Sequence, residues 1–215
     1  MRQRQHSLPA GLYLLAWNTD KQKLTSTDTI GHVVRAGALA ELALRGLLTD
    51  ADGRPAVAEG APTGEPALDD LLELIARSRP LAWKGWINQG VKPTLTAVRE
   101  QLAEAGCLSL DTHRIGGLIS VTTVNPPPSG AGDLLRNRAV RALRGEGPAD
   151  AVPDHDAALI TLAAAGGLRT VISEADSRAY QQRLAALAGR GGPVGEALRR
   201  ILPELRETVA VAHAG

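Results

Sequence analysis

The strongest constraint on the fold of this chain is the segment 30–48, which is apolar on almost every face of a helix. A helix of that kind is stable only when other elements enclose it, so the segment predicts a buried central helix. Glu41 and Arg45 stand four positions apart in it and predict an intrahelical ion pair. Arg35 has no acidic residue three or four positions away, so its partner must come from elsewhere in the fold or from a ligand.

The composition favours helices packed on helices. Among 215 residues there is no Phe, and only 2 Tyr and 3 Trp, so Leu and Ala must build the core. Strands draw on aromatic and β-branched residues, whereas Leu and Ala favour helices. A hydrophobic content of 44% and a charged content of 22% exclude wholesale disorder, and the length suits a single domain over residues 1–215.

Apolar periodicity and capping residues predict further helices before and after the central one. Ser173 with Asp176 resembles a capping box at the start of one of them. The segment 8–17 contains Pro9 and Gly11, and we interpret it as the first folded segment and not as a secretory signal. The other helices are expected at 66–78, around Trp83 and Trp86, and at 93–105, 133–144, 155–165, 174–188 and 193–212.

One convincing β-hairpin is predicted at about residues 107–124. Its β-like runs, 107–110 and 118–124, are separated by Asp111-Thr-His-Arg-Ile-Gly-Gly. A second, shorter hairpin around residues 52–53 is a weaker expectation. If the longer hairpin projects, its unpaired edges and apolar side chains favour self-association or membrane contact, and otherwise it folds down on its own domain. We expect a homo-oligomer through its apolar residues Ile115, Leu118, Ile119 and Val121.

No sequence motif indicates catalysis or metal binding. Cys107 is the only cysteine, and no two of the five histidines stand four residues apart, so neither an intrachain disulfide nor a helical zinc site is expected. Phosphate-binding loops and nucleophile elbows are absent. Asp154-His155-Asp156 suits a helix start with Asp154 as the N-cap. We therefore expect no enzyme activity, no metal and no cofactor.

The charge balance argues against a general nucleic-acid-binding surface, since 24 Lys and Arg oppose 23 Asp and Glu. In the stretch 41–60 a helix is followed by a Gly-rich hairpin, as in the winged-helix motif of DNA-binding regulators. Its helix has few exposed hydrogen-bond donors and its loop is not basic, which argues against DNA binding. Arg138, Arg141 and Arg144 share one face of the expected helix 133–144. That face either is simply solvated or rests on anionic lipid headgroups.

Several segments in the same order resemble the Golgi phosphoprotein 3 family, in a bacterial-type member. They are Leu8-Pro-Ala-Gly-Leu-Tyr-Leu-Leu-Ala, Glu41-Leu-Ala-Leu-Arg-Gly, Pro62-Thr-Gly-Glu-Pro-Ala-Leu-Asp-Asp and Leu102-Ala-Glu-Ala-Gly-Cys-Leu before the hairpin. The resemblance implies a mainly α fold, with a helical-bundle core surrounded by amphipathic helices and one projecting β-hairpin. It also implies a non-catalytic cytoplasmic protein that binds phosphatidylinositol 4-phosphate, or another anionic phospholipid headgroup, peripherally on the cytosolic face of a membrane.

The resemblance places the ligand site partly on residues of this chain. Arg35, ten residues before Arg45, matches a pocket arginine of the family, while the pocket tryptophan nine residues earlier falls on Ser26. The family's paired arginines fall near 93–95, where Lys92 and Arg99 are the nearest cations. Arg35, Lys92 and Arg99 are therefore the candidate ligand-binding residues.

Two alternatives stay open at this point. Arg35 either contacts a phosphate or forms a buried ion pair with a carboxylate from another element. The protein either binds lipid or is a self-associating adaptor that uses the hairpin and has lost lipid binding.

Overall fold

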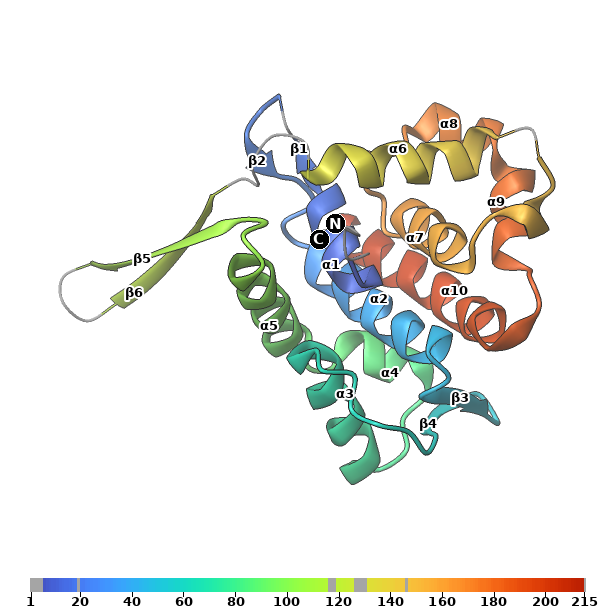
Figure 1. The fold of residues 1–215 in the computed structure, drawn as a ribbon, viewed down its shortest axis with the longest axis horizontal. Helices are drawn as coiled ribbons and strands as arrows, with labels where there is room; N and C mark the ends of the chain where they lie inside the picture. The colour runs from blue at the N-terminus through green and yellow to red at the C-terminus, as the bar shows by residue number, and fades with distance from the viewer. Residues whose placement is uncertain (1–5, 19, 116–118, 126–130, 146, 215) are drawn as a thin grey trace.

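The computed structural model describes residues 6–18, 20–115, 119–125, 131–145 and 147–214. The fold is mainly α-helical, as predicted, with α2 (Ile30–Leu44) at its centre (Figure 1). Of the 15 residues of α2, 13 are buried, because α1, α5, α7 and α10 all pack against it. The described helices around it are α1 (Leu8–Leu15), α3 (Pro66–Arg77), α4 (Trp83–Asn88), α5 (Val91–Glu104), α6 (Ala131–Arg144), α7 (Asp154–Ala165), α8 (Glu174–Ala179), α9 (Gln181–Ala188) and α10 (Gly192–Ala214).

Gly37 sets the spacing between helices α1 and α2. A Cβ atom at Gly37 of α2 would lie 2.6 Å from Leu12 Cδ1 and 3.2 Å from the Cα of Pro9 in α1. The two helices therefore approach each other more closely there than any side chain on residue 37 allows. Leu and Ala fill most of the surrounding core, as the composition predicts.

Two helices differ from the sequence prediction by more than two residues at a boundary or by a break within them. The central helix ends at Leu44, because Gly46 adopts a left-handed conformation (φ +72°) and Leu47 N–H donates to the carbonyl of Leu42 at 2.8 Å. This is a Schellman-type stop, so Leu48 begins a strand. The helix expected at 174–188 divides into α8 and α9 at Tyr180, whose backbone is not helical (φ −102°, ψ 21°). The predicted capping box is confirmed, since Asp176 N–H donates to Ser173 Oγ at 3.0 Å.

The strands of the described residues form antiparallel pairs only. Residues 52–53 do connect a hairpin, as expected. The pairing of residues 17–18 with residues 23–24 was not predicted, because strands of two residues are too short to show alternating apolar and polar side chains. The pairs are β1 (Trp17–Asn18) with β2 (Lys23–Leu24), β3 (Leu48–Ala51) with β4 (Arg54–Val57), and β5 (Ser109–Ile115) with β6 (Ile119–Asn125).

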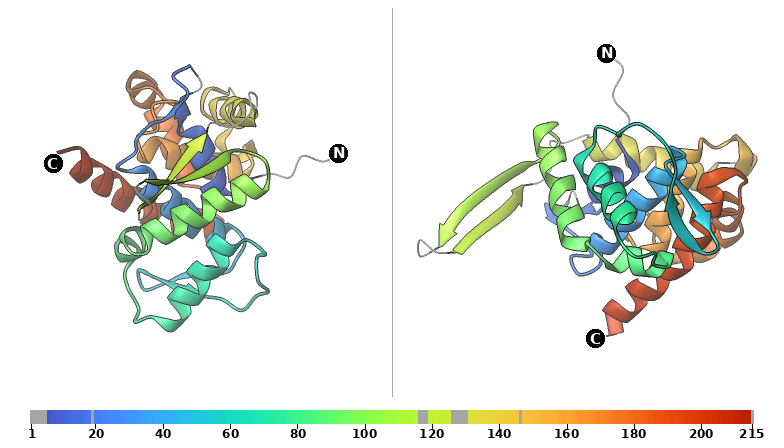
Figure 2. Two further views of the ribbon diagram at one scale, coloured as in Figure 1. Left: turned by 90° about the vertical axis from the view of Figure 1, so that its left-hand side faces the viewer. Right: turned by 90° about the horizontal axis from the view of Figure 1, so that it is seen from below.

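The β5–β6 hairpin projects from the helical body, as the resemblance implies (Figures 1 and 2). Its first strand is longer than predicted: residues 111–115, expected to be a loop, pair with the opposite strand. Thr112 faces Thr122 with their hydroxyls 3.1 Å apart, a cross-strand pair of β-branched residues that suits a ladder. Leu118 lies outside the described residues, as do the side chains of Ile115, Ile119 and Val121.

No helix in the described part of the chain is both long enough and apolar enough to cross a membrane.

Candidate functional site

Arg35 lies inside the protein, with only 2% of the residue exposed. Its Nε donates to the carbonyl of Trp86 at 3.0 Å, and its Nη1 donates to Thr94 Oγ1 at 2.6 Å. Its Nη2 is buried and has no hydrogen-bond partner among the described residues. No carboxylate of the described residues forms an ion pair with it, so the structure does not support the alternative of a buried ion pair.

Arg35 and His32, one helical turn apart on α2, both reach the end of α4. The Nδ1 of His32 lies 3.4 Å from the carbonyl oxygen of Ile87, next to the Trp86 carbonyl that Arg35 binds. The last carbonyls of a helix lack partners within it, so these contacts satisfy the C-terminus of α4. Burial lowers the pKa of Arg35 to about 10, since removal from water disfavours the charged form.

Gly90 brings the backbone against this guanidinium. It is the N-cap of α5 and adopts a left-handed conformation (φ +71°). A Cβ atom there would lie 3.1 Å from Arg35 Nη2 and 3.3 Å from Cζ. A side chain at residue 90 would therefore be strained by the backbone conformation and would press against the guanidinium.

On the surface, Gly90 lines a hollow of about 560 Å³, which we call the α2–α5 hollow. It lies between the start of α2, the end of α4 and the start of α5. Lys92 also lines the hollow and is exposed. Gly90 therefore borders both the hollow that contains Lys92 and the buried guanidinium of Arg35. The complete lining is Thr27, Asp28, Gly31, His32, Asn88, Gly90, Val91, Lys92, Pro93 and Leu95.

Of the three residues expected at the ligand, only Lys92 lines the hollow: Arg35 lies behind Gly90 and does not line it, and neither does Arg99. The Nε of Arg99 donates to the hydroxyl of Tyr13 at 3.0 Å, and its Cζ lies 5.4 Å from the centroid of that ring. Burial raises the pKa of Tyr13, an effect that the nearby Arg99 opposes. Arg99 therefore connects α5 to α1.

Ser26, at the position of the family tryptophan, forms the turn into α2 instead of a wall of the hollow. It has a positive φ (+55°), and its carbonyl accepts from the N–H of Ile30 at 2.7 Å. The next residues, Thr27 and Asp28, line the hollow, together with Asn88 from α4. Sequence reasoning missed Asp28 and Asn88, because only the tertiary packing brings the two ends of helices together.

The arginines of α6 are largely engaged in ion pairs. Arg138 Nη2 lies 2.6 Å from Asp156 Oδ1, and Arg144 Nη2 lies 3.0 Å from Asp176 Oδ1. Burial raises the pKa of Asp156, but Arg138 and His155 outweigh this effect and hold it below its usual value. These pairs favour a structural role for Arg138 and Arg144 over a lipid-facing one.

The expectation for Asp154 is wrong by one residue. Pro153 occupies the N-cap position of α7, and Asp154 pairs with Arg190 at 2.8 Å. Within the described residues, no group of three or more His, Cys, Asp or Glu side chains is arranged to hold a metal ion.

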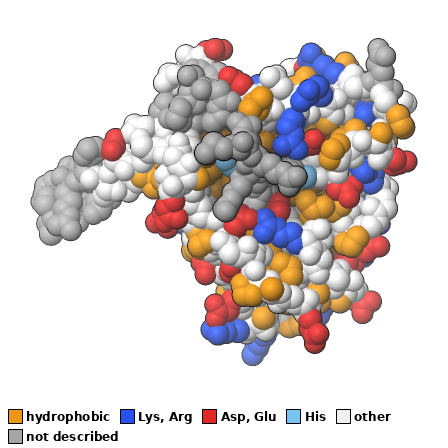
Figure 3. All heavy atoms as spheres, viewed as in Figure 1, with side chains coloured by type: hydrophobic (Ala, Val, Ile, Leu, Met, Phe, Trp, Pro, Cys, Tyr) orange, Lys and Arg blue, Asp and Glu red, His pale blue; other side chains and the backbone are white. Residues whose placement is uncertain are grey.

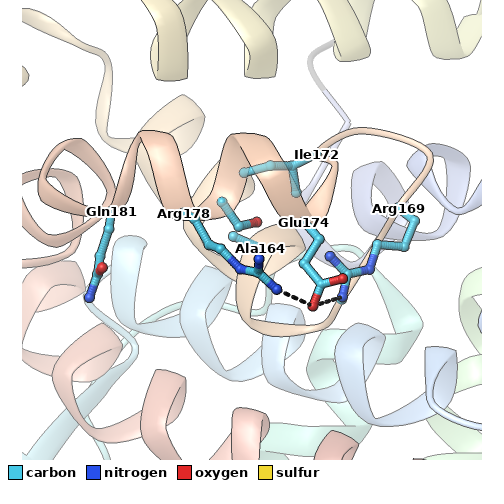
Figure 4. A pocket seen from close by; sticks show the side chains of 8 residues that line it. Ala164, Arg169, Ile172, Glu174, Arg178 and Gln181 are labelled. Atoms are coloured by element: carbon cyan, nitrogen blue, oxygen red, sulfur yellow. Dashed lines mark ion pairs between the residues drawn. The ribbon is translucent and has the colours of Figure 1, made fainter.

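A second surface hollow, of about 300 Å³, lies beside α8 (Figure 4). Arg169 and Arg178 both approach Glu174 there, with N–O distances of 3.7 and 3.4 Å. The two cations share a carboxylate already, so this hollow is a poor site for an anion. On the face shown in Figure 3, acidic and basic side chains are interspersed, in keeping with the near-neutral sequence.

Comparison with known proteins matches the resemblance noted in the sequence. No curated protein matches the chain. A family model described as Golgi phosphoprotein 3 (GPP34) matches residues 8–205, which run from the start of α1 to within α10. The match includes the central helix, the α2–α5 hollow and the projecting hairpin, and the chain therefore belongs to the Golgi phosphoprotein 3 family.

Proposed function

We propose that this protein is a non-enzymatic, peripheral membrane protein of the cytosolic membrane face that binds the phosphate of a phospholipid headgroup in the α2–α5 hollow. Phosphatidylinositol 4-phosphate or another anionic phospholipid is the ligand that family membership favours. The observation that carries the proposal is the unpartnered, buried Nη2 of Arg35 against Gly90, with exposed Lys92 two residues farther along.

The start of α5 adds the donors that a phosphate requires. The first N–H groups of a helix have no intrahelical acceptor and carry partial positive charge. At α5 the residues Val91 and Lys92 border the hollow, and no side chain of the described residues caps the helix start. The Lys92 ammonium would bind phosphate as a point charge, while the charge of Arg35 adds to the field from behind Gly90.

The experiment is co-sedimentation of the full chain with phosphatidylcholine vesicles, with and without phosphatidylinositol 4-phosphate or phosphatidylglycerol. We expect binding to vesicles that contain either anionic lipid, and weaker binding for Lys92→Gln. Arg141→Gln, which removes an exposed cation of α6, is the matched control and should bind as wild type. Binding to no vesicle, or equal loss in both variants, would overturn the proposal.

A second candidate function is self-association through the β5–β6 hairpin, in a protein–protein adaptor. The observation that favours it is that both outer edges of this sheet are unpaired in the described chain, since β5 and β6 pair only with each other. Exposed strand edges readily pair with another chain.

A further inference from the structure

A hollow of about 770 Å³, which we call the β4–α3 hollow, lies between the β3–β4 hairpin and the end of α3. It is larger than the α2–α5 hollow, and its volume falls in the range of about 300–1,000 Å³ that is typical of small-molecule sites. Its walls are mostly apolar and include Pro55, Val57, Ile75 and Pro80. Val57 is 41% exposed, so the described chain leaves part of this apolar surface uncovered.

Trp86 of α4 also lines the β4–α3 hollow, and it is completely buried, with 0% of the residue exposed. Its indole Nε1 has no hydrogen-bond acceptor among the described residues. Trp83, on the same helix, has the acceptor that a buried indole usually finds, since its Nε1 donates to Asp50 Oδ1 at 2.6 Å. Because a buried donor without an acceptor costs free energy, a ligand that supplies one gains affinity over a ligand that does not.

The charges at the β4–α3 hollow balance each other. Its lining contains one acid and one base, Asp52 and Arg54, and both are exposed. A charged ligand would lose its hydration against the apolar walls and gain little from this balanced pair. An indole N–H donates and cannot accept, so the group that complements Trp86 is a neutral acceptor.

We propose that the β4–α3 hollow binds an uncharged, largely apolar small molecule that carries a hydrogen-bond acceptor, such as a carbonyl oxygen, for the Nε1 of Trp86. The apolar walls hold the body of the ligand, and the unpartnered indole selects the acceptor. The β4–α3 hollow and the α2–α5 hollow share no lining residue, so this inference goes beyond the proposed lipid binding and does not depend on it.

The test compares benzophenone with diphenylmethane, which has a methylene where benzophenone has its carbonyl. Two-dimensional ¹H–¹⁵N NMR of the full chain resolves the indole N–H signals of its three tryptophans, Trp17, Trp83 and Trp86. We expect benzophenone to shift the signal of Trp86 and to leave that of Trp17 in place. Benzophenone should bind about fivefold more tightly than diphenylmethane, the equivalent of one neutral hydrogen bond.

Two variants locate the bound molecule. Trp86→Phe keeps an aromatic ring but removes the N–H, so it should bind the two probes equally well. Trp17→Phe is the matched control, because the Nε1 of Trp17 is also buried without an acceptor but Trp17 does not line the hollow. It should keep the fivefold preference. Ala76→Phe adds a large side chain at an exposed lining position and should weaken the binding of both probes.

The outcomes that would overturn the proposal are equally definite. Equal affinity of the wild type for the two probes, or an unchanged preference in Trp86→Phe, would overturn the assignment of the indole N–H as the donor. Binding of neither probe, or binding that Ala76→Phe leaves unchanged, would overturn the β4–α3 hollow as the site. None of these results bears on binding to vesicles, so the proposed function is tested separately.

Discussion

At the scale of single residues, Arg35 is unusual because it is charged and buried without an acid. Burial lowers its pKa to about 10, so the folded state holds its proton less tightly than the unfolded chain does. At neutral pH the guanidinium is charged in both states, and its desolvation opposes folding by roughly 3 kcal/mol. That cost lessens only as the pH rises above about 10, where the folded state begins to lose the proton. The hydrogen bonds of Arg35 to the Trp86 carbonyl and the Thr94 hydroxyl oppose this cost.

Substitution of Arg35 tests this view. Arg35→Met fills similar volume and removes the buried charge, but it leaves the Trp86 carbonyl and the Thr94 hydroxyl without their donor. We expect these effects to offset, with a free energy of unfolding within about 1 kcal/mol of wild type. Arg35→Ala also leaves a cavity and should lower it by about 3 kcal/mol. Urea denaturation followed by circular dichroism measures both. A Met variant as unstable as the Ala variant would show that the hydrogen bonds of Arg35 stabilise the fold.

The Arg138–Asp156 pair predicts a dependence of stability on acid. The pKa of Asp156 lies below its usual 3.8, so its carboxylate stabilises the fold above that value. This contribution is lost as the pH falls through the lower, folded-state pKa. We expect Asp156→Asn to lose stability at neutral pH and to show a shallower loss between pH about 5 and 2. Thermal unfolding at a series of pH values measures this. Parallel curves for the two proteins would contradict it.

At the scale of elements, the packing of α1 on α2 depends on residues that have no side chain to contribute. Because a Cβ at Gly37 would lie 2.6 Å from Leu12 Cδ1, the distance between the two helices is set by this glycine. By helix propensity alone, alanine would be the better residue in the middle of α2. The demands of packing and propensity are therefore opposed at this position.

We expect packing to prevail, so that Gly37→Ala lowers the free energy of unfolding by about 1–3 kcal/mol. The matched control is Gly191→Ala in the loop before α10, where a new Cβ would meet nothing within 4 Å. Chemical denaturation of the two variants measures the difference. A Gly37→Ala variant that is more stable than wild type would mean that α1 moves away from α2 at little cost.

At the scale of the whole molecule, the β5–β6 hairpin stands clear of the helical body, and so does the end of α10 (Figure 2). The hairpin contributes little to the core, since apart from its own pairing it contacts chiefly the end of α5, which precedes it. Because exposed strand edges readily pair with another chain, the hairpin is the element through which we propose self-association.

We expect replacement of residues 111–123 by Gly-Gly to convert an oligomer into a monomer without loss of the helical fold. Light scattering gives the molar mass, and circular dichroism checks the helix content. An unchanged mass would exclude the hairpin as the oligomer interface. If lipid binding also persists in the monomer, the hollow and the hairpin act independently.

The elements were largely predictable because each depends on a local pattern. The all-round apolar segment is the buried α2, and the capping box at Ser173 opens α8. The prediction failed where one backbone conformation decided the outcome, at Gly46, which ends α2, and at Tyr180, which separates α8 from α9. Residues 111–115 were misread because a strand that pairs with a neighbour tolerates polar residues that look like a loop.

The candidate site was only half predictable. The amino-acid sequence by itself determined that Arg35 lies in a buried helix without a local acidic partner, since helical spacing decides both points. Only the tertiary structure decided that its partners are a carbonyl of α4 and a hydroxyl of α5, that Arg99 binds Tyr13, and that Asp28 and Asn88 face the same hollow as Lys92. Those contacts join residues far apart along the chain, and their geometry follows from how the helices pack rather than from any pattern within a single segment.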